Sequence, residues 1–488
     1  MAGTSSTAPV ALEFETFLNV VDGKLAWTEA TRNSVNPSTL DENPQVPLST
    51  PADVDKAVEA ATKAWPAWAE TPWAKRQDAI KAYAGALEAH VDDFARMLVL
   101  EQGKPLHLAR FEILAALRFL REFSDMTLPE QVIEETEEPY YKVSLRHVPL
   151  GVAVGIVPWN YPVFLSLGKV GPALLTGNVF ILKPSPFTPY CGIKLVEIAQ
   201  QFFPPGVLQV LSGDDHLGPW LTSHPGVHKV TFTGSTATGK RVMESCGATL
   251  KSVTLELGGN DAAIVCADVD PETVAPKLAD LALSNSGQLC IAIKRIYVHE
   301  SIYSAVLTHL VEHVKGMKVG DGFAQGVTLG PIANRPQYDR VKALLHEIQS
   351  TGLKTATGDA FQSNLAGKGL FISPTIVDNP PDTSAIVVEE PFGPVVPILK
   401  WSDEAEVVRR ANDTDMGLGA SVWTNDAALA GRLSRKLRAG TIWTNTHGVL
   451  KSNAPFSGVK QSGIGVEYGT EGLKDYCAIQ TVHTTFKV

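Results

Sequence analysis

The sequence predicts an α/β protein with a parallel sheet covered by helices. The chain of 488 residues is too long for one compact core, so two or more domains are expected. From Gly151 onward, short apolar runs alternate with helix-length segments, and strands this apolar are typical of sheets buried on both faces. Spacings of roughly 20–30 residues fit right-handed crossover connections. This is a nucleotide-binding type of architecture, although architecture alone does not fix a function.

Composition and charge argue against two classes of partner. The chain carries 42 Lys and Arg against 52 Asp and Glu, a net charge of −10, with no dense basic cluster. Nucleic acid and anionic membranes are therefore not expected as partners. No run approaches the ~20 apolar residues that span a bilayer. The opening stretch MAGTSSTAPV lacks the features of a signal peptide, so we expect a cytoplasmic protein with a loose tail.

The chain before residue 146 is expected to be largely helical. Thr50, Pro51 and Asp53 are typical of an N-cap, a first-turn proline and a capping-box partner. A second helix is predicted to end at Gly103. The apolar faces are Val54, Val58, Ala61 and Trp65 in the first helix and Ile80, Tyr83, Leu87, Val91, Phe94 and Leu98 in the second.

The strands of the first sheet follow from the apolar runs. They are GVAVGIV at 151–157, NVFIL at 178–182, GVLQVL at 206–211, HKVTF at 228–232 and KSVTLEL at 251–257. A second α/β region extends to about residue 460, with a strand at 294–299, a helix near 301–316 and an apolar run at 420–424. Residues 129–146 are typical of a charged hairpin. The last stretch, CAIQTVHTTFKV, alternates like a strand that pairs with another part of the fold or another subunit.

The five cysteines are scattered, without a CxxC pair or a nearby His at metal-ligand spacing. A disulfide framework and a zinc site are both unsupported. Cys290 lies in SNSGQLCIAIK, where small polar residues suggest a loop with an open approach and the apolar residues after it suggest an anchor. By itself, this thiol fits a small buried residue as well as a nucleophile.

Several polar motifs follow the predicted strands, where ligands bind in an open parallel sheet. TGSTATGK at 233–240 opens a helix whose N-terminus could hold a pyrophosphate, although it is not GxGxxG. Lys183 begins KPSPFTP. Asn160 lies between the prolines of PWNYP, either as an oxyanion donor or as an ordinary turn residue. Glu256 ends a strand, as a general base or as a partner for a helix end.

Together these motifs carry a resemblance. PWNYP, LKPSPFTP, FTGSTATGK, LELGGN, GQLC, EEPFGP and PFSGVKQSGIGVE occur in the order found in the aldehyde dehydrogenase superfamily. The chain resembles that family over almost its whole length. The separation of Glu256 and Cys290 by 34 residues (290 − 256) agrees with it.

The resemblance implies oxidation of a small aldehyde to a carboxylic acid with NAD or NADP and without a metal. Cys290 would attack the aldehyde carbon, and Asn160 with the Cys290 amide would bind the oxyanion. Glu256 would activate the water that hydrolyses the thioester, and Lys169 and Glu467 would relay protons. The thiol is expected to be partly ionised, favoured by the adjacent helix end, backbone amides and a bound nicotinamide cation. The implied cofactor-binding residues are Trp159, Lys183, Ser185, Gly234, Ser235, Leu257, Glu390 and Phe392.

The resemblance also implies a domain division and a homodimer or homotetramer. The Rossmann-like cofactor domain would comprise residues 1–125 and 147–257, and the catalytic domain 258–473. A small β oligomerisation arm would comprise 126–146 and 474–488.

Two departures from the family pattern bear on specificity. Pro186 stands where many relatives have a Glu that binds the adenosine ribose of NAD, which leaves the choice between NAD and NADP open. Ser185 could donate to a 2′-phosphate. Gly168 replaces a bulky residue and is expected to widen the substrate tunnel, for which Phe164, Tyr161, Ile291 and His447 are candidate contacts.

Two other functions stay open at this point. A coenzyme A-acylating relative would pass the acyl group to a second thiol, whereas Glu256 favours transfer to water. A thiol esterase would have no redox role and would form no NADH or NADPH from any aldehyde. The sequence does not name the aldehyde.

Overall fold

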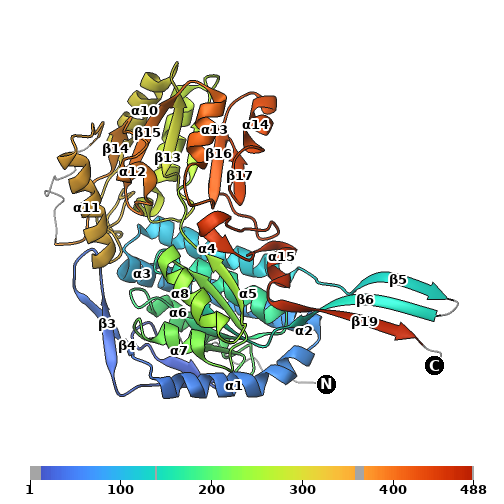
Figure 1. Ribbon diagram of the computed structural model, residues 1–488. Helices are drawn as coiled ribbons and strands as arrows, with labels where there is room; N and C mark the ends of the chain where they lie inside the picture. Colours follow the sequence, from blue (N-terminus) through green and yellow to red (C-terminus); the bar gives the residue numbers. More distant parts are fainter. Residues whose placement is uncertain (1–12, 138–139, 358–367, 486–488) are drawn as a thin grey trace.

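A computed structural model describes residues 13–137, 140–357 and 368–485 and shows two α/β lobes from which a long β arm projects (Figure 1). The predicted α/β class is confirmed, since each lobe has a largely or wholly parallel sheet. The predicted tail MAGTSSTAPV lies outside the described residues. Within the described ranges, no helix is long and apolar enough to cross a membrane.

The first sheet has eight strands in the order β18-β11-β10-β7-β8-β9-β1-β2. All five strands predicted from the apolar runs form its parallel centre, and their residues are almost entirely buried. Antiparallel strands complete both edges. The bounds are β1 Asn19–Val21, β2 Lys24–Ala26, β7 Val152–Ile156, β8 Val179–Lys183, β9 Leu208–Val210, β10 Lys229–Thr233, β11 Ser252–Glu256 and β18 Gly463–Ile464.

Helices cover this sheet, and the first begins as predicted. The Thr50 side chain and the Asp53 side chain form a reciprocal capping box at the start of α1. The bounds are α1 Pro51–Glu70, α2 Trp73–Glu88, α3 Val91–Gln102, α4 Leu106–Ser124, α5 Pro162–Leu175, α6 Tyr190–Ala199, α7 Leu217–Ser223, α8 Thr236–Gly247 and α15 Gly469–Lys474.

The prediction of one continuous second helix was wrong. The chain forms α2 and α3, separated at Ala89 and His90, where amides bond three residues back and His90 leaves helical geometry (φ −113°, ψ 18°). The apolar residues predicted for this helix are buried in both α2 and α3. The break therefore changes the direction of the chain without exposing the apolar face of α3. The predicted end is confirmed, because Gly103 adopts φ 91°, which favours glycine.

The chain before residue 146 is also less helical than predicted. It contains β1 and β2 of the first sheet and a separate two-stranded sheet, β3 Thr31–Val35 and β4 Glu42–Pro47. These strands are short, and β1 pairs with β9, which lies far along the chain. Local periodicity carries no signal for such a pairing.

The second lobe contains a six-stranded parallel sheet in the order β14-β15-β13-β12-β16-β17. Its strands are β12 Ala262–Val265, β13 Arg295–His299, β14 Thr375–Asp378, β15 Val395–Trp401, β16 Gly419–Trp423 and β17 Thr441–Thr444. Its helices are α9 Pro271–Leu283, α10 Tyr303–Gly316, α11 Arg335–Ser350, α12 Ala385–Val388, α13 Glu404–Asn412 and α14 Ala427–Ser434.

The predicted hairpin and final strand form one antiparallel arm. β5 (Gln131–Glu137) pairs with β6 (Tyr140–Pro149), and β19 (Cys477–Thr485) pairs with the other edge of β6. The arm extends from the first lobe (Figure 1). Its role in oligomerisation and the exact domain ranges stay predictions.

Candidate active site

Four predicted site residues lie at the carboxyl ends of the parallel strands of the first sheet. Lys183 and Glu256 are the last residues of β8 and β11, and Asn160 and Gly234 follow β7 and β10. The ends of these neighbouring parallel strands are paired in register. The sheet therefore presents an amide, a carboxyl group, an ammonium group and a helix start at the edge where ligands bind in such folds.

A cavity of about 450 Å³ lies between these strand ends and the second lobe. Asn160, Glu256, Cys290 and Glu467 all line it, although they come from four separate segments. The four candidate tunnel contacts also line it, namely Tyr161, Phe164, Ile291 and His447. The arrangement places a thiol, an amide and a carboxyl group around one cavity.

The turn before Cys290 is buried and fixed by hydrogen bonds. The expectation that its polar residues form an open approach to the thiol is therefore wrong. Asn285 and Ser286 have left-handed backbone conformations, with φ of 52° and 57°, and both are buried. Ser286 Oγ donates to the Gly330 oxygen (2.7 Å), and Gln288 Oε1 accepts from the N–H of Ala333 (2.9 Å). The polar atoms therefore fix the turn against the second lobe, and positive φ values at such a site store strain in the backbone.

The Asn160 side chain is also fixed, with one donor to spare. Its Nδ2 donates to the main-chain oxygen of Gln288 (3.1 Å), and its Oδ1 has no partner within the described residues. A side-chain amide carries two N–H bonds, so one remains free to donate. This geometry is compatible with binding an oxyanion formed beside Cys290.

A fully buried ion pair supports the Asn160 loop, and sequence reasoning missed it. Lys104 Nζ donates to the main-chain oxygen of Asn160 (2.9 Å) and pairs with Glu112. The other Glu112 oxygen accepts from the N–H groups of Val163 (2.9 Å) and Phe164 (3.2 Å) at the start of α5. The sequence showed Lys104 only as a residue after a helix end, because its contact with Asn160 joins segments that lie far apart in the chain.

Glu256 and Cys290 influence each other's protonation. Burial, together with the charge of Glu467, raises the pKa of Glu256 to about 8, and the Cys290 thiol and Lys169 oppose this shift. Neither Glu256 oxygen has a hydrogen-bond partner among the described residues. Burial and the Glu256 charge raise the pKa of the Cys290 thiol, while Lys294 lowers it. The surrounding protein groups therefore favour the neutral thiol, and they do not by themselves produce the predicted partial ionisation.

Lys169 and Glu467, predicted as a relay pair, are in contact. They form a buried ion pair, and Lys169 Nζ also donates to Thr231 Oγ1 (3.1 Å). Thr231 Oγ1 lies 3.4 Å from the same Glu467 carboxylate. Glu467 also lines the cavity, and its charge raises the pKa of Glu256, so this ion pair lies at the cavity wall.

Gly168 does not widen the cavity, which corrects the sequence expectation. A Cβ at this position would lie 3.2 Å from Cε1 and 3.3 Å from the hydroxyl oxygen of Tyr468. The Tyr468 ring occupies the space that a larger residue 168 would take, and it lines the cavity itself.

The predicted cofactor residues of the second lobe lie next to the Cys290 loop. Glu390 accepts from the N–H of Gly259 (3.2 Å), and Lys294 Nζ lies 3.3 Å from the same carboxylate oxygen. Lys294 Nζ also donates to the main-chain oxygen of Cys290 (2.6 Å). Lys294, which the sequence reasoning did not single out, thus links the thiol loop to Glu390.

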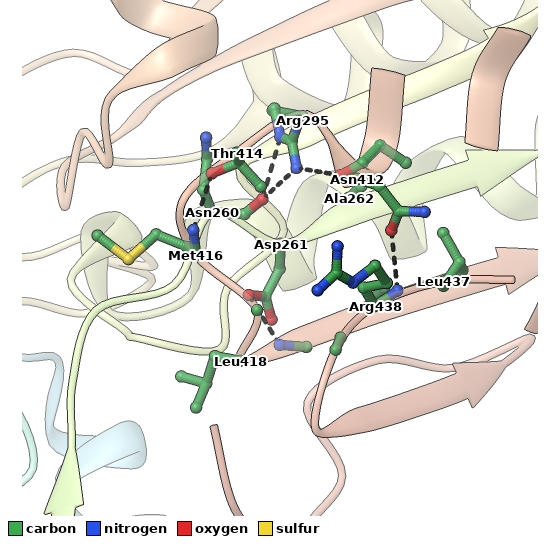
Figure 2. Close-up of a pocket in the computed structure, with 15 residues that line it drawn as sticks. Asn260, Asp261, Ala262, Arg295, Asn412, Thr414, Met416, Leu418, Leu437 and Arg438 are labelled. Carbon is green, nitrogen blue, oxygen red and sulfur yellow. Dashed lines mark hydrogen bonds between the residues drawn. The ribbon is translucent and has the colours of Figure 1, made fainter. Parts of the chain in front are cut away.

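Arg295 fixes the turn that carries Gly259. It lines a small hollow of about 10 Å³ and donates to the main-chain oxygens of Asn260 (3.0 and 2.7 Å) and Ala411 (2.9 Å) (Figure 2). Asp261 accepts from the Gly419 N–H (3.1 Å) on the other side. Main-chain oxygens accept the hydrogen bonds of the guanidinium, so the role of Arg295 is structural: it holds the segment after β11 against the second lobe.

Known proteins resemble this chain in both sequence and structure. Residues 27–482 match the model of the aldehyde dehydrogenase family. The chain belongs to the aldehyde dehydrogenase family. An aldehyde dehydrogenase of a Fusarium species is 39% identical over 97% of this chain and 99% of its own length. The phenylacetaldehyde dehydrogenase of Pseudomonas fluorescens is 37% identical, with 94% and 93% covered. The betaine aldehyde dehydrogenase of Staphylococcus aureus, solved with NAD⁺, has a TM-score of 0.92 at 30% identity, with 96% and 97% covered.

Aldehyde dehydrogenases oxidise aldehydes with NAD or NADP, and the residues of this chain fit such a dinucleotide. Ser235 caps α8, whose first turn is partly exposed and can bind a pyrophosphate through its N–H groups. Gly234 leaves no room for a side chain, since a Cβ would lie 2.5 Å from the Phe232 ring. Leu257 packs against Gly239 at the start of the same helix.

Lys183, Trp159 and Phe392 are further candidates for contact with the cofactor. Lys183 is buried, and within the described part of the chain its ammonium forms one hydrogen bond, to the Pro184 oxygen (3.4 Å). Burial lowers the pKa of Lys183 to about 8. Arg32 donates to the main-chain oxygen of Pro186, the position without the acid. The Trp159 and Phe392 rings meet edge to face, with their centroids 5.4 Å apart.

Proposed function

We propose that this aldehyde dehydrogenase forms a covalent intermediate on Cys290 and releases a carboxylic acid by hydrolysis. The observation that carries the proposal is the shared cavity, in which Cys290, Asn160 and Glu256 meet. Cys290 Sγ attacks the aldehyde carbon, and the thiol proton leaves to solvent or to Glu256. The free N–H of Asn160 and the main-chain N–H of Cys290 stabilise the developing oxyanion.

NAD or NADP, when bound, supplies the acceptor for the hydride that the thiohemiacetal carbon loses. Cys290 then carries a thioester, which is reactive enough to hydrolyse and stable enough to persist. Glu256 removes a proton from the attacking water, and its pKa near 8 is close to the working pH that a general base requires. Lys169 and Glu467 pass this proton away from the cavity. The aldehyde and water together yield the acid.

The cofactor is held by three groups of residues in this proposal. Gly234, Ser235 and Leu257 form the pyrophosphate site, and Trp159, Glu390 and Phe392 form the ribose site near Cys290. Lys183 and Ser185 contact the adenosine ribose. Since Pro186 removes a negative charge from that site, we propose that NADP is accepted as well as NAD. The arm is proposed to join subunits into a homodimer or homotetramer.

Product analysis tests the proposed function. Purified enzyme is incubated with a panel of aldehydes and NAD or NADP, with and without coenzyme A, and the products are quantified. We expect reduced cofactor and free acid in equal amounts without coenzyme A. An obligatory thiol acceptor would indicate the acylating alternative, and ester hydrolysis without any reduced cofactor would indicate the esterase. Cys290→Ala abolishes the reaction, whereas the matched variant Cys477→Ala, in the arm, retains it.

A further inference from the structure

The cavity around Cys290 is built from flat apolar surfaces. Its volume of about 450 Å³ lies in the range of pockets that enclose ligands much larger than acetaldehyde. A two-carbon aldehyde would leave water against apolar walls, which is unfavourable. The aromatic lining residues are Phe111, Phe119, Tyr161, Phe164, Phe456 and Tyr468.

Tyr468 is the centre of this aromatic wall. Its ring lies edge to face with Phe119 at 5.3 Å and with Phe164 at 6.3 Å, and nearly parallel to Phe456 at 6.1 Å and Phe123 at 5.9 Å. Both arrangements are favourable for aromatic pairs. Among the described residues, no group forms a hydrogen bond with the Tyr468 hydroxyl. The ring is therefore held by packing, and its hydroxyl lies beside Gly168.

The backbone and Gly168 both specify the position of the Tyr468 ring. Tyr468 has φ 62° and ψ 170°, a conformation that residues with a side chain rarely adopt. The preceding residue, Glu467, is fixed by two main-chain hydrogen bonds with Phe456 (2.7 and 2.8 Å). The missing side chain at Gly168 leaves the space for the ring. Strain of this kind persists where surrounding structure holds it, and here it fixes the ring in the cavity wall.

The charges in the cavity wall argue against a positively charged substrate. Arg118 and Lys451 line the cavity, and both are solvent-exposed. The Glu112 carboxylate in the wall is neutralised by Lys104. Glu256 and Glu467 lie at the reacting end. Aromatic walls can bind ammonium groups, but the body of a bound cation would here meet Lys451 and Arg118, of which, among the described residues, only Arg118 lies beside an acid, Glu122.

We propose that this cavity selects aldehydes with a flat aromatic body and no positive charge, and that Tyr468 is the residue that makes the selection. The proposal rests on the proposed function for the chemistry at Cys290. The aromatic body packs against the Tyr468 ring and its neighbours, while the aldehyde carbon reaches the thiol. Position 168 acts only through the space it leaves for this ring.

Steady-state kinetics with three aldehydes test the selection. 3-Phenylpropanal, butanal and betaine aldehyde are compared in the full-length enzyme and in Tyr468→Leu, Tyr468→Phe and Gly168→Ala. We expect kcat/KM for 3-phenylpropanal to exceed that for butanal by about 10- to 100-fold, from the apolar area of the ring. Betaine aldehyde is the poorest of the three. Tyr468→Leu raises KM for 3-phenylpropanal about tenfold more than for butanal, and Tyr468→Phe, which keeps the ring, does not. Gly168→Ala shifts the preference in the same direction as Tyr468→Leu.

Calorimetric binding of 3-phenylpropanoate and butanoate to each variant gives a readout without catalysis. We expect tighter binding of 3-phenylpropanoate, lost in Tyr468→Leu and kept in Tyr468→Phe. Equal KM changes for both aldehydes in Tyr468→Leu, or a preference for betaine aldehyde, would overturn the proposal. If no aldehyde is oxidised, the proposed function fails, and the two carboxylates still decide whether Tyr468 selects aromatic bodies.

Discussion

The ammonium of Lys104 lies 2.9 Å from the main-chain oxygen of Asn160, which joins the proposed oxyanion loop to a fully buried ion pair with Glu112. Removing one member of a buried pair leaves an uncompensated charge, which costs about 3–5 kcal/mol of unfolding free energy. We expect Lys104→Met to show this loss in denaturant titrations and to lower kcat at least tenfold, because the loop shifts.

A double variant separates positioning from stability. Lys104→Met with Glu112→Leu removes both charges and should recover part of the free energy of unfolding, but not kcat, since the Asn160 oxygen still lacks its donor. If kcat recovers together with stability, the pair supports only folding, and its positioning role is wrong.

Asn160→Ala tests the oxyanion donor. Removal of one such donor typically lowers kcat about 100- to 1000-fold. The free energy of unfolding should fall by only about 1 kcal/mol, because the side chain makes one hydrogen bond, to Gln288. Steady-state kinetics and denaturant titration measure the two quantities. A variant with normal kcat would remove Asn160 from the mechanism.

Glu256→Gln should make the Cys290 thiol more acidic. The Glu256 charge is one of the causes that raise the pKa of this thiol, so a neutral amide leaves more thiolate at a given pH. We expect iodoacetamide to alkylate Cys290 faster in the variant between pH 8 and 9, in the absence of cofactor. Cys290→Ala corrects for the other four cysteines. Equal rates in the two proteins would show that Glu256 does not act on the thiol.

NADP binding should weaken as pH rises through about 8. Burial lowers the pKa of Lys183 to about this value, so its ammonium is charged below pH 8 and neutral above it. The Kd for NADP, measured by fluorescence quenching, should increase between pH 7 and 9, more than the Kd for NAD. Lys183→Met should bind weakly at every pH. If the Kd of the unaltered enzyme for NADP does not depend on pH, Lys183 does not contact the 2′-phosphate of NADP.

Local sequence signals predicted the parts of the fold that local physics determines. The Thr50 capping box, the Gly103 helix end and the five apolar strands each depend on residues within one element. The edge strand β1 was missed because its partner β9 lies far along the chain.

The same limit applies to the site. Motif order placed Asn160, Glu256 and Cys290, which the structure brings to one cavity. The support from Lys104 and the link from Lys294 to Glu390 were missed, because both depend on contacts between distant segments. Gly168 was misjudged because its meaning depends on the Tyr468 ring.

The central claim is that Cys290 forms a thioester which Glu256 hydrolyses, and rapid mixing of Glu256→Gln with aldehyde and cofactor tests it most directly. We predict a burst of about one reduced cofactor per active site, then a steady rate reduced roughly 100-fold or more, as expected for loss of a general base. Mass spectrometry of the quenched protein should find the acyl group on Cys290. A steady rate equal to that of the unaltered enzyme, or an acyl group absent from Cys290 after the burst, would contradict the account.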